Sequence, residues 1–184
     1  KSLMIVDMPF NTYKNKSQAL KNCKKVMKET KCDGIKLEGG RKIIEIIKYL
    51  IKFKIPVMGH IGITPQTVKG KFRYKGKTDI EKKNLLKDSK SLEDSGVFAI
   101  VLECIEKKVS KEITESIKIP TIGIGSSNFC DGQILVTDDL LGLTDTKIKF
   151  VKKYADLKGS VKNAVKKFKL DVKKGSYPSI KYSY

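Results

Sequence analysis

The chain has 184 residues, of which 39 are Lys or Arg and 20 are Asp or Glu, so its formal net charge at pH 7 is +19. Hydrophobic residues make up 40% of the chain, which is a globular composition and excludes a disordered one. The chain contains no run of about 18 apolar residues, which argues against a transmembrane helix, and the first residues lack a cleavable signal pattern. We therefore expect one soluble, cytoplasmic domain.

The charge and cysteine patterns argue against two kinds of site. Only two of the 39 basic residues, Arg41 and Arg73, are arginines, although arginine is best suited to bidentate recognition of guanine and phosphate. The lysines are spread along the chain, mostly on the polar faces of expected helices, so we expect a solvated surface and no specific nucleic-acid partner. The four cysteines form no CxxC pair, which favours reduced thiols over a zinc site.

Short apolar runs alternate with amphipathic segments along the chain. Strands are expected at residues 3–6, 34–38, 56–60, 97–103 and 120–125, with another near 134–136. Helices are expected at 17–28, 43–51, 79–95 and 109–117. Strands that alternate with helices in this way predict an α/β fold with parallel strand pairing and right-handed crossovers.

Polar residues stand where these expected strands end. Asp7, Glu38, His60, Glu103 and Gly125 each lie at the carboxyl end of a strand, where an α/β barrel or open sheet places its catalytic groups. Four of the five can bind a metal or transfer a proton. Any one of them alone could be an ordinary loop residue, and His60 alone could be a structural histidine. Their coincidence predicts a functional site at this edge of the sheet.

Three further segments allow more than one interpretation. The run from Gly123 to Ser127 is a weak candidate for an anion-binding loop. The segment from Lys69 to Thr78 interleaves basic and aromatic residues, which fits either single-stranded nucleic acid or a lid beside an active site. Residues 160–174 form an expected Lys-rich amphipathic helix that could pack on its own domain or on a partner subunit.

The segments around the strand ends are DMPF (7–10), IKLEGG (35–40), PVMGHIGITPQ (56–66), FAIVLECI (98–105) and IPTIGIGSSNFCDGQILV (119–136), and the chain closes with YPSIKYSY. In order and spacing they closely resemble the ketopantoate hydroxymethyltransferase family over essentially the whole chain. The resemblance implies a TIM-type (β/α)8 barrel of the phosphoenolpyruvate/pyruvate type. It implies a single domain over residues 1–184, with a C-terminal helix at about 160–174.

The resemblance also implies an activity. Members of the family transfer a hydroxymethyl group from 5,10-methylenetetrahydrofolate to 3-methyl-2-oxobutanoate, giving 2-dehydropantoate for pantothenate and coenzyme A biosynthesis, with Mg²⁺ as cofactor. The implied partners are these small molecules and further copies of the chain, since the family is commonly a decamer. Neither a membrane nor a nucleic acid is implied.

Carried over residue by residue, the resemblance assigns roles to five side chains. Asp7 resembles a direct magnesium ligand in the substrate site, and Glu38 resembles a carboxylate that binds the metal directly or through water. Lys36 and His60 match residues that contact the 2-oxo acid, and Glu103 matches the proton acceptor. These types suit the chemistry, because Mg²⁺ prefers oxygen ligands and, as a Lewis acid, lets a carboxylate base form an enolate.

The sequence departs from the family's pattern in three places. The family's first two βα units are absent, including a Gly-Asp-Ser segment that supplies a second metal-binding aspartate and a substrate-contacting serine. We therefore expect this chain alone to leave the barrel open, because its strands are fewer than the eight that closure needs. Ser126 and Ser127 replace the usual Ala-Gly, and the basic segment after residue 68 is shorter than the usual Gly-rich loop.

Two other functions remain open from the sequence. The chain could be another lyase or mutase of the same barrel superfamily, which would share magnesium and a 2-oxo acid but cleave or rearrange its substrate. Such relatives usually carry a catalytic cysteine or an additional acidic loop motif, and neither is evident here. It could also be a non-catalytic protein that binds polyanions through its lysines, which salt-dependent DNA binding without magnesium-dependent activity would indicate.

Overall fold

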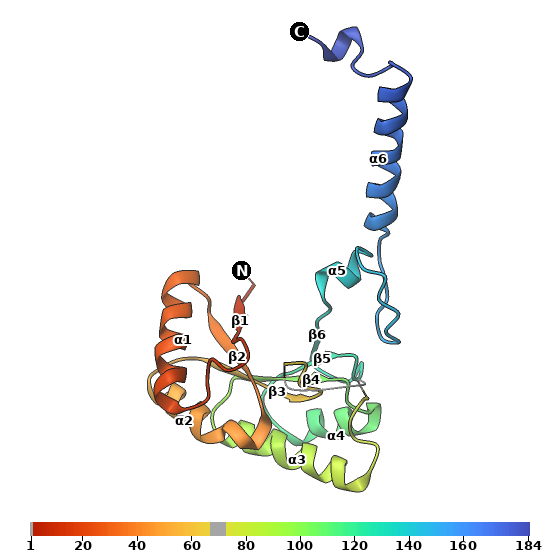
Figure 1. The fold of residues 1–184 in the computed structure, drawn as a ribbon. Coiled ribbons are helices and arrows are strands. Elements are labelled where there is room, and N and C mark those ends of the chain that lie inside the picture. Colours follow the sequence, from red (N-terminus) through yellow and green to blue (C-terminus); the bar gives the residue numbers. More distant parts are fainter. Residues whose placement is uncertain (1, 67–72) are drawn as a thin grey trace. The chain divides into compact units, whose positions relative to one another are not determined.

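Six parallel strands form one sheet in a computed structural model that describes residues 2–66 and 73–184 (Figure 1). The strands are β1 (Ile5–Asp7), β2 (Gly34–Glu38), β3 (Val57–Gly62), β4 (Ala99–Glu103), β5 (Thr121–Ile124) and β6 (Gly132–Gln133). They pair in sequence order, from β1 next to β2 through to β5 next to β6. Order without a reversal is that of a β/α barrel wall and differs from a doubly wound sheet, in which the order reverses at a switch point.

Helices connect the first five strands, as the sequence predicted. They are α1 (Lys16–Thr30), the 3-10 turn η1 (Gly40–Ile43) with α2 (Ile44–Lys52), α3 (Asp79–Asp94) and α4 (Lys107–Ser116). Side chains cap three of the helices: Asn15 accepts from the Gln18 amide, Thr78 from the Glu81 amide and Glu106 from the amides that open α4. These caps satisfy amide groups that a helix start leaves without a partner.

The sixth strand lies earlier than predicted. Its paired residues are Gly132 and Gln133, opposite Ile122 and Gly123, whereas residues 134–136 lie outside any strand. The apolar run at residues 134–136 suggested a strand there, but the position of the strand is set by hydrogen bonds to Asp131, which apolar periodicity does not indicate. The Asp131 carboxylate accepts hydrogen bonds from the Thr121 amide and hydroxyl, which brings the chain alongside β5 just before Gly132.

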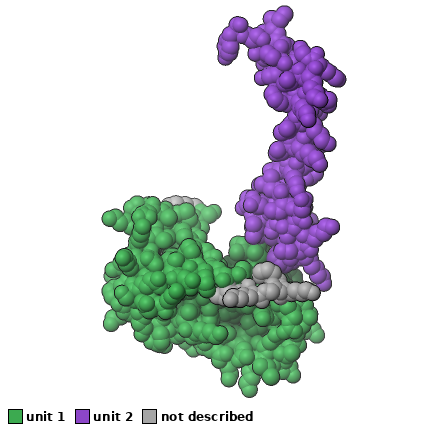
Figure 2. Space-filling model, in the orientation of Figure 1, with its two compact units in different colours: residues 1–134 green, residues 135–184 purple. Residues whose placement is uncertain are grey.

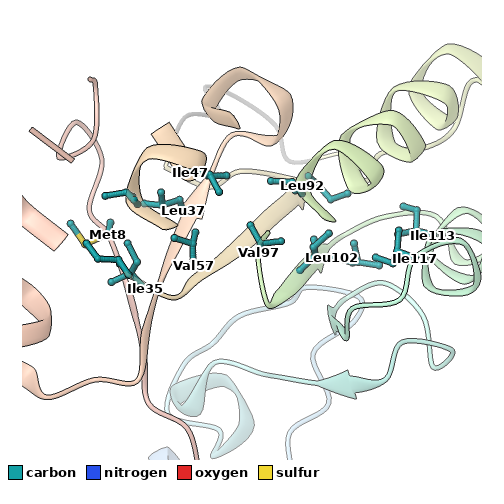
Figure 3. Close-up of a cluster of buried hydrophobic side chains, with 14 of the residues drawn as sticks. Met8, Ile35, Leu37, Ile47, Val57, Leu92, Val97, Leu102, Ile113 and Ile117 are labelled. Atoms are coloured by element: carbon teal, nitrogen blue, oxygen red, sulfur yellow. The ribbon is translucent and has the colours of Figure 1, made fainter. Parts of the chain in front are cut away.

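The hydrophobic core lies where the strands face the helices (Figure 3). Side chains alternate between the two faces of a strand, so in β2 the buried Ile35 and Leu37 alternate with Lys36 and Glu38. The core collects Leu37, Val57 and Leu102 from the strands and Ile47, Leu92 and Ile113 from the helices. Burying one such side chain contributes about 1.5–3 kcal/mol. The core therefore fixes which face of the sheet carries the polar residues.

The chain divides into two compact units, residues Lys1–Ile134 and Leu135–Tyr184 (Figure 2). The second unit contains α5 (Thr137–Leu140), α6 (Leu157–Lys173) and the 3-10 turn η2 (Ile180–Tyr182). Helix α6 corresponds to the helix expected at 160–174 and contains no buried residue. The single domain over residues 1–184 stays a prediction.

Three smaller expectations can be compared with the structure. The four cysteines are all free thiols, as predicted. Among the described residues, no helix is long and apolar enough to cross a membrane. Of the expected lid segment, residues 69–72 lie outside the described residues, and Lys75 forms an isolated parallel bridge with Ile105 just beyond β4.

Candidate active site

The strand register brings the predicted polar residues to one face at the carboxyl edge of the sheet. Asp7 lies opposite Lys36, Glu38 lies opposite His60, and Gly62 lies opposite Glu103. Because side chains alternate along a strand, Lys36 and Glu38 point away from the helices, as does His60 on β3. The site is thus a direct product of the parallel pairing.

Close contacts join all five predicted side chains. The Lys36 Nζ atom lies 2.9 Å from Asp7 Oδ2 and 3.7 Å from Glu38 Oε1. It also lies 3.1 Å from His60 Nδ1. His60 Nε2 lies 3.3 Å from Glu103 Oε2, so the imidazole stands between the carboxylates of Glu38 and Glu103. The structure therefore brings together the five side chains to which the family resemblance assigns roles, whereas Gly125, the remaining strand-end residue, makes none of these contacts.

Exposure increases from the floor of this cluster to its rim. The His60 side chain is fully buried and that of Glu38 is 3% exposed, whereas Lys36 and Glu103 are 16% and 18% exposed and Asp7 is 45% exposed. A ligand arriving from solvent would meet Asp7, Lys36 and Glu103 first. Glu38 and His60 lie beneath these three residues and form a preorganised floor of the cluster.

Burial and charge act in opposite directions on the two innermost groups. Burial by itself lowers the pKa of His60, but the neighbouring carboxylates of Glu103 and Glu38 outweigh it and raise the pKa above the ordinary value. Burial raises the pKa of Glu38, yet the contact with His60, the Lys36 charge and a backbone hydrogen bond from Gln66 bring it below the ordinary value. The contact thus shifts Glu38 toward its ionised form and His60 toward its protonated form.

The charge balance of the cluster favours a cation. Three carboxylates, those of Asp7, Glu38 and Glu103, face one ammonium and one imidazole, so the group keeps a net negative charge. Oxygens of Asp7 and Glu38 already converge on one cationic nitrogen, that of Lys36. Within the described ranges, no group of three His, Cys, Asp or Glu is arranged to hold a metal. Two carboxylates nevertheless fit Mg²⁺, which usually keeps several waters.

Two residues that the sequence analysis missed hold Glu38 in place. The Tyr13 hydroxyl donates to the Glu38 carbonyl and accepts from the Glu38 amide, both at 3.3 Å, and burial raises the pKa of Tyr13. The Gln66 amide donates to Glu38 Oε2 at 3.3 Å, and its side-chain nitrogen donates to the Met8 carbonyl at 3.1 Å. Both residues lie in loops beyond strand ends, where apolar periodicity gives no signal. The quoted segment that ends in Pro65-Gln66 was the available clue.

The turn after β4 holds Glu103 through its backbone. The Glu103 carbonyl accepts from the Ile63 amide at 2.9 Å, and Cys104 adopts a left-handed conformation with φ 49°. The Ser126 hydroxyl donates to the Leu102 carbonyl and accepts from the Ile105 amide, so it spans this turn. The segment considered as an anion-binding loop thus uses the Ser126 hydroxyl to support the neighbouring strand end.

A cavity of about 500 Å³ adjoins the cluster at Glu38 and His60. Its walls come from the segments that follow β1, β2 and β3, together with residues of α2 and α3. Aromatic Phe10 and Tyr13 and apolar Ile43 are among its lining residues. Aromatic and apolar walls beside a few ionisable groups are typical of a small-molecule site.

Comparison with known proteins places this geometry in a family. Residues 1–180 match the family model described as ketopantoate hydroxymethyltransferase. A 3-methyl-2-oxobutanoate hydroxymethyltransferase of Pelagibacter ubique (strain HTCC1062) is 58% identical over 184 residues, which cover 100% of this chain and 71% of that protein. The enzyme of the same name from Clostridium botulinum (strain Alaska E43 / Type E3) is 48% identical over 187 residues, covering 100% of this chain and 68% of that protein.

A solved structure gives a weaker match. The chloride-inhibited dihydrodipicolinate synthase from Acinetobacter baumannii, in complex with pyruvate, is 16% identical with a TM-score of 0.46. The match covers 66% of this chain and 44% of that one. At this level the likeness bears on neither fold nor function, which rest on the sheet and on the sequence relatives.

Proposed function

Because the chain belongs to the ketopantoate hydroxymethyltransferase family, we propose that it transfers a hydroxymethyl group from 5,10-methylenetetrahydrofolate to 3-methyl-2-oxobutanoate, giving 2-dehydropantoate. The relatives are named as transferases of this kind, so the chain is an enzyme of that class. The observation that carries the proposal is the cluster at the sheet edge, where one ammonium bridges two carboxylates and an imidazole reaches a third.

Asp7 and Glu38 are the residues that would hold Mg²⁺. Their carboxylate oxygens are the ligands that this ion prefers, and they approach a shared cationic position. When bound, the ion supplies Lewis-acid stabilisation of the negative charge that develops on the 2-oxo oxygen. Asp7 also borders the space that the substrate would enter, since it is the most exposed member of the cluster.

Lys36 and His60 would bind and orient the 2-oxo acid. The Lys36 ammonium, whose side chain is 16% exposed, would pair with the substrate carboxylate. His60 lies between Glu38 and Glu103, and its Nε2 atom, which has no hydrogen-bond partner among the described residues, would donate toward developing charge. Fixed donors of this kind cost no reorganisation during the reaction.

Glu103 would act as the base. Its carboxylate takes the proton from C3 of the substrate as the C3–H bond breaks, and the electron pair moves into the enolate. The methylene carbon of the folate forms one bond to C3 and one to the oxygen of a water molecule, while both of its carbon–nitrogen bonds break. The proton taken from C3 and one proton of the water end on the two folate nitrogens, and the other water proton stays on the new hydroxymethyl group. The backbone contacts of Ile63 and Ser126 around Glu103 would keep the carboxylate aligned with C3.

The remaining family features are also proposals for this chain. We propose that the six-stranded sheet is part of a TIM-type (β/α)8 barrel, in keeping with its sequential strand order. We further propose a homo-oligomer that acts in the cytoplasm on small-molecule substrates, without a nucleic-acid or membrane partner.

The proposal is tested by measuring 2-dehydropantoate formed from the two substrates by mass spectrometry, with Mg²⁺ or with EDTA. We expect product with Mg²⁺, loss of product with EDTA and recovery when Mg²⁺ is restored. A Lys36→Met variant should raise the KM for the 2-oxo acid, whereas Lys48→Met, on the surface of α2, should leave it unchanged. Absence of product from a folded chain would contradict the function, and product that survives EDTA would contradict the metal.

A further inference from the structure

Gln66 connects two segments of the candidate site that are far apart in the sequence. Its backbone amide donates to Glu38 Oε2 at 3.3 Å, and its side-chain nitrogen donates to the carbonyl of Met8 at 3.1 Å. Met8 directly follows Asp7 at the end of β1, whereas Glu38 ends β2. Gln66, a single residue in the loop after β3, therefore contacts both strand ends that carry the proposed metal ligands.

The orientation of the Gln66 amide follows from its partner. A carbonyl oxygen only accepts, so the nitrogen of the amide must be the atom that faces Met8. The other amide atom, Oε1, is buried and has no hydrogen-bond partner among the described residues. The side-chain nitrogen thus makes the contact that holds the side chain. A substitution that tests the contact must remove this hydrogen-bond donor.

The turn after β1 also contacts β2 and α1. The Met8 amide donates to the Lys36 carbonyl at 3.1 Å, and the Tyr13 hydroxyl bonds to the Glu38 backbone. The side-chain nitrogens of two α1 residues donate to turn carbonyls, Gln18 to Asn11 and Asn22 to Thr12. The hydrogen bond from the Gln66 side chain to Met8 links this turn to the loop after β3. The same loop holds the Glu38 carboxylate through the Gln66 amide.

We propose that Gln66 is a positioning residue that fastens the turn carrying Asp7 to Glu38 and so sets how these two carboxylates face one another. This inference rests on the proposed function, in which Asp7 and Glu38 hold Mg²⁺. Residues that orient metal ligands commonly change metal affinity about 10- to 100-fold when they are replaced. Gln66 would act through Asp7 and Glu38, without contact with the reacting atoms.

The test compares Gln66→Met with Gln133→Met in the full chain. Methionine is close to glutamine in size but cannot donate to a carbonyl. Gln133 is a matched control, because its side-chain nitrogen also donates to a loop carbonyl, that of Ser127 at 2.7 Å, but it lies on β6. Thermal unfolding of both variants would establish that each is folded.

The first measurement is metal-free hydrogen–deuterium exchange, followed by mass spectrometry of peptides that cover residues 8–14. Gln66→Met should exchange about 2- to 10-fold faster there, the factor expected for the loss of one hydrogen bond. Gln133→Met should match the wild-type chain. Unchanged exchange in Gln66→Met overturns the inference, whatever the metal does.

The second measurement is Mg²⁺ binding by calorimetry. Gln66→Met should bind Mg²⁺ about 10-fold more weakly, and turnover at saturating Mg²⁺ should return to within about twofold of wild type, which a general folding defect would not allow. Equal affinity in Gln66→Met and wild type overturns the inference. A wild-type chain that binds no Mg²⁺ contradicts the metal in the proposed function instead, and the exchange measurement still decides the role of Gln66.

Discussion

Residues 1–134 and residues 135–184 contain helices of similar length with very different burial. Helix α3 has 16 residues and buries Leu85 and Leu92, whereas α6 has 17 residues and buries none. In α6 the apolar Val165 and Phe168 are 60% and 55% exposed. Apolar periodicity therefore predicts that a helix forms, but burial also needs an apposed surface.

The two units also differ in their polar groups. In the first unit, the sheet has a core on one face and the polar cluster at the carboxyl edge of the other. In the second unit, Asp139 is a buried acidic residue and accepts a hydrogen bond from Thr144. We therefore expect substitutions in the first unit to dominate both stability and activity.

Truncation of one leucine in each unit should show the largest difference in stability. Leu102, on β4, is fully buried, so Leu102→Ala should lower the free energy of unfolding by about 2–5 kcal/mol. Leu170, on α6, is 52% exposed, and Leu170→Ala should change it by less than about 0.5 kcal/mol. Urea denaturation of the two variants measures both values. Equal losses would show that α6 is packed in solution.

A glycine in each unit gives a smaller contrast. A Cβ atom on Gly62 would lie 2.1 Å from the Glu103 carbonyl oxygen, and φ is +105°, so Gly62→Ala should cost about 3 kcal/mol and displace Glu103. Gly175 has φ +67° and nothing within 4 Å, so Gly175→Ala should cost about 1 kcal/mol from backbone strain alone. Unfolding curves and activity would separate them. Wild-type activity in a folded Gly62→Ala variant would contradict the close approach.

The pH dependence of stability should come from the first unit, because His60 is the only histidine in the chain. Its pKa in the folded state is raised, so its favourable contribution is complete below about pH 6.5 and is lost as the pH rises through the folded pKa. Metal-free unfolding curves between pH 6 and 8.5 should therefore show stability that declines as the pH rises. This change should be smaller than those of the leucine and glycine variants, because it reflects the ionisation of one group. His60→Gln should remove the decline. A rise in this range would contradict the raised pKa.

Much of the first unit was predictable because its signals are local. Strand and helix positions followed from apolar periodicity, and the site followed from Glu38 and Glu103 at strand ends and from His60, although β3 continues to Gly62, two residues beyond its predicted end. Parallel pairing in sequence order then brings such ends together without further information. Lys36 entered only through the family resemblance, and its contact with Asp7 agrees with that assignment.

The unpredicted parts depend on contacts between distant segments. Gln66 and Met8 are 58 residues apart, and neither lies at a position that periodicity marks. The shift of β6 to Gly132 depends on the bonds from Thr121 to Asp131. Helix α6 buries no residue although its apolar residues recur at helical spacing, because such a pattern does not specify the surface against which a helix packs.

The most direct test of the account is exchange of the C3 hydrogen of 3-methyl-2-oxobutanoate in heavy water, with Mg²⁺ and without folate, followed by proton NMR. We predict exchange that requires Mg²⁺ and falls about 100- to 10,000-fold in Glu103→Gln, the range expected for loss of a general base. Glu112→Gln, which removes a surface carboxylate of α4 paired with Lys82, should exchange at the wild-type rate. Wild-type exchange in Glu103→Gln, or no exchange from the folded wild-type chain, would contradict the proposed role of this site.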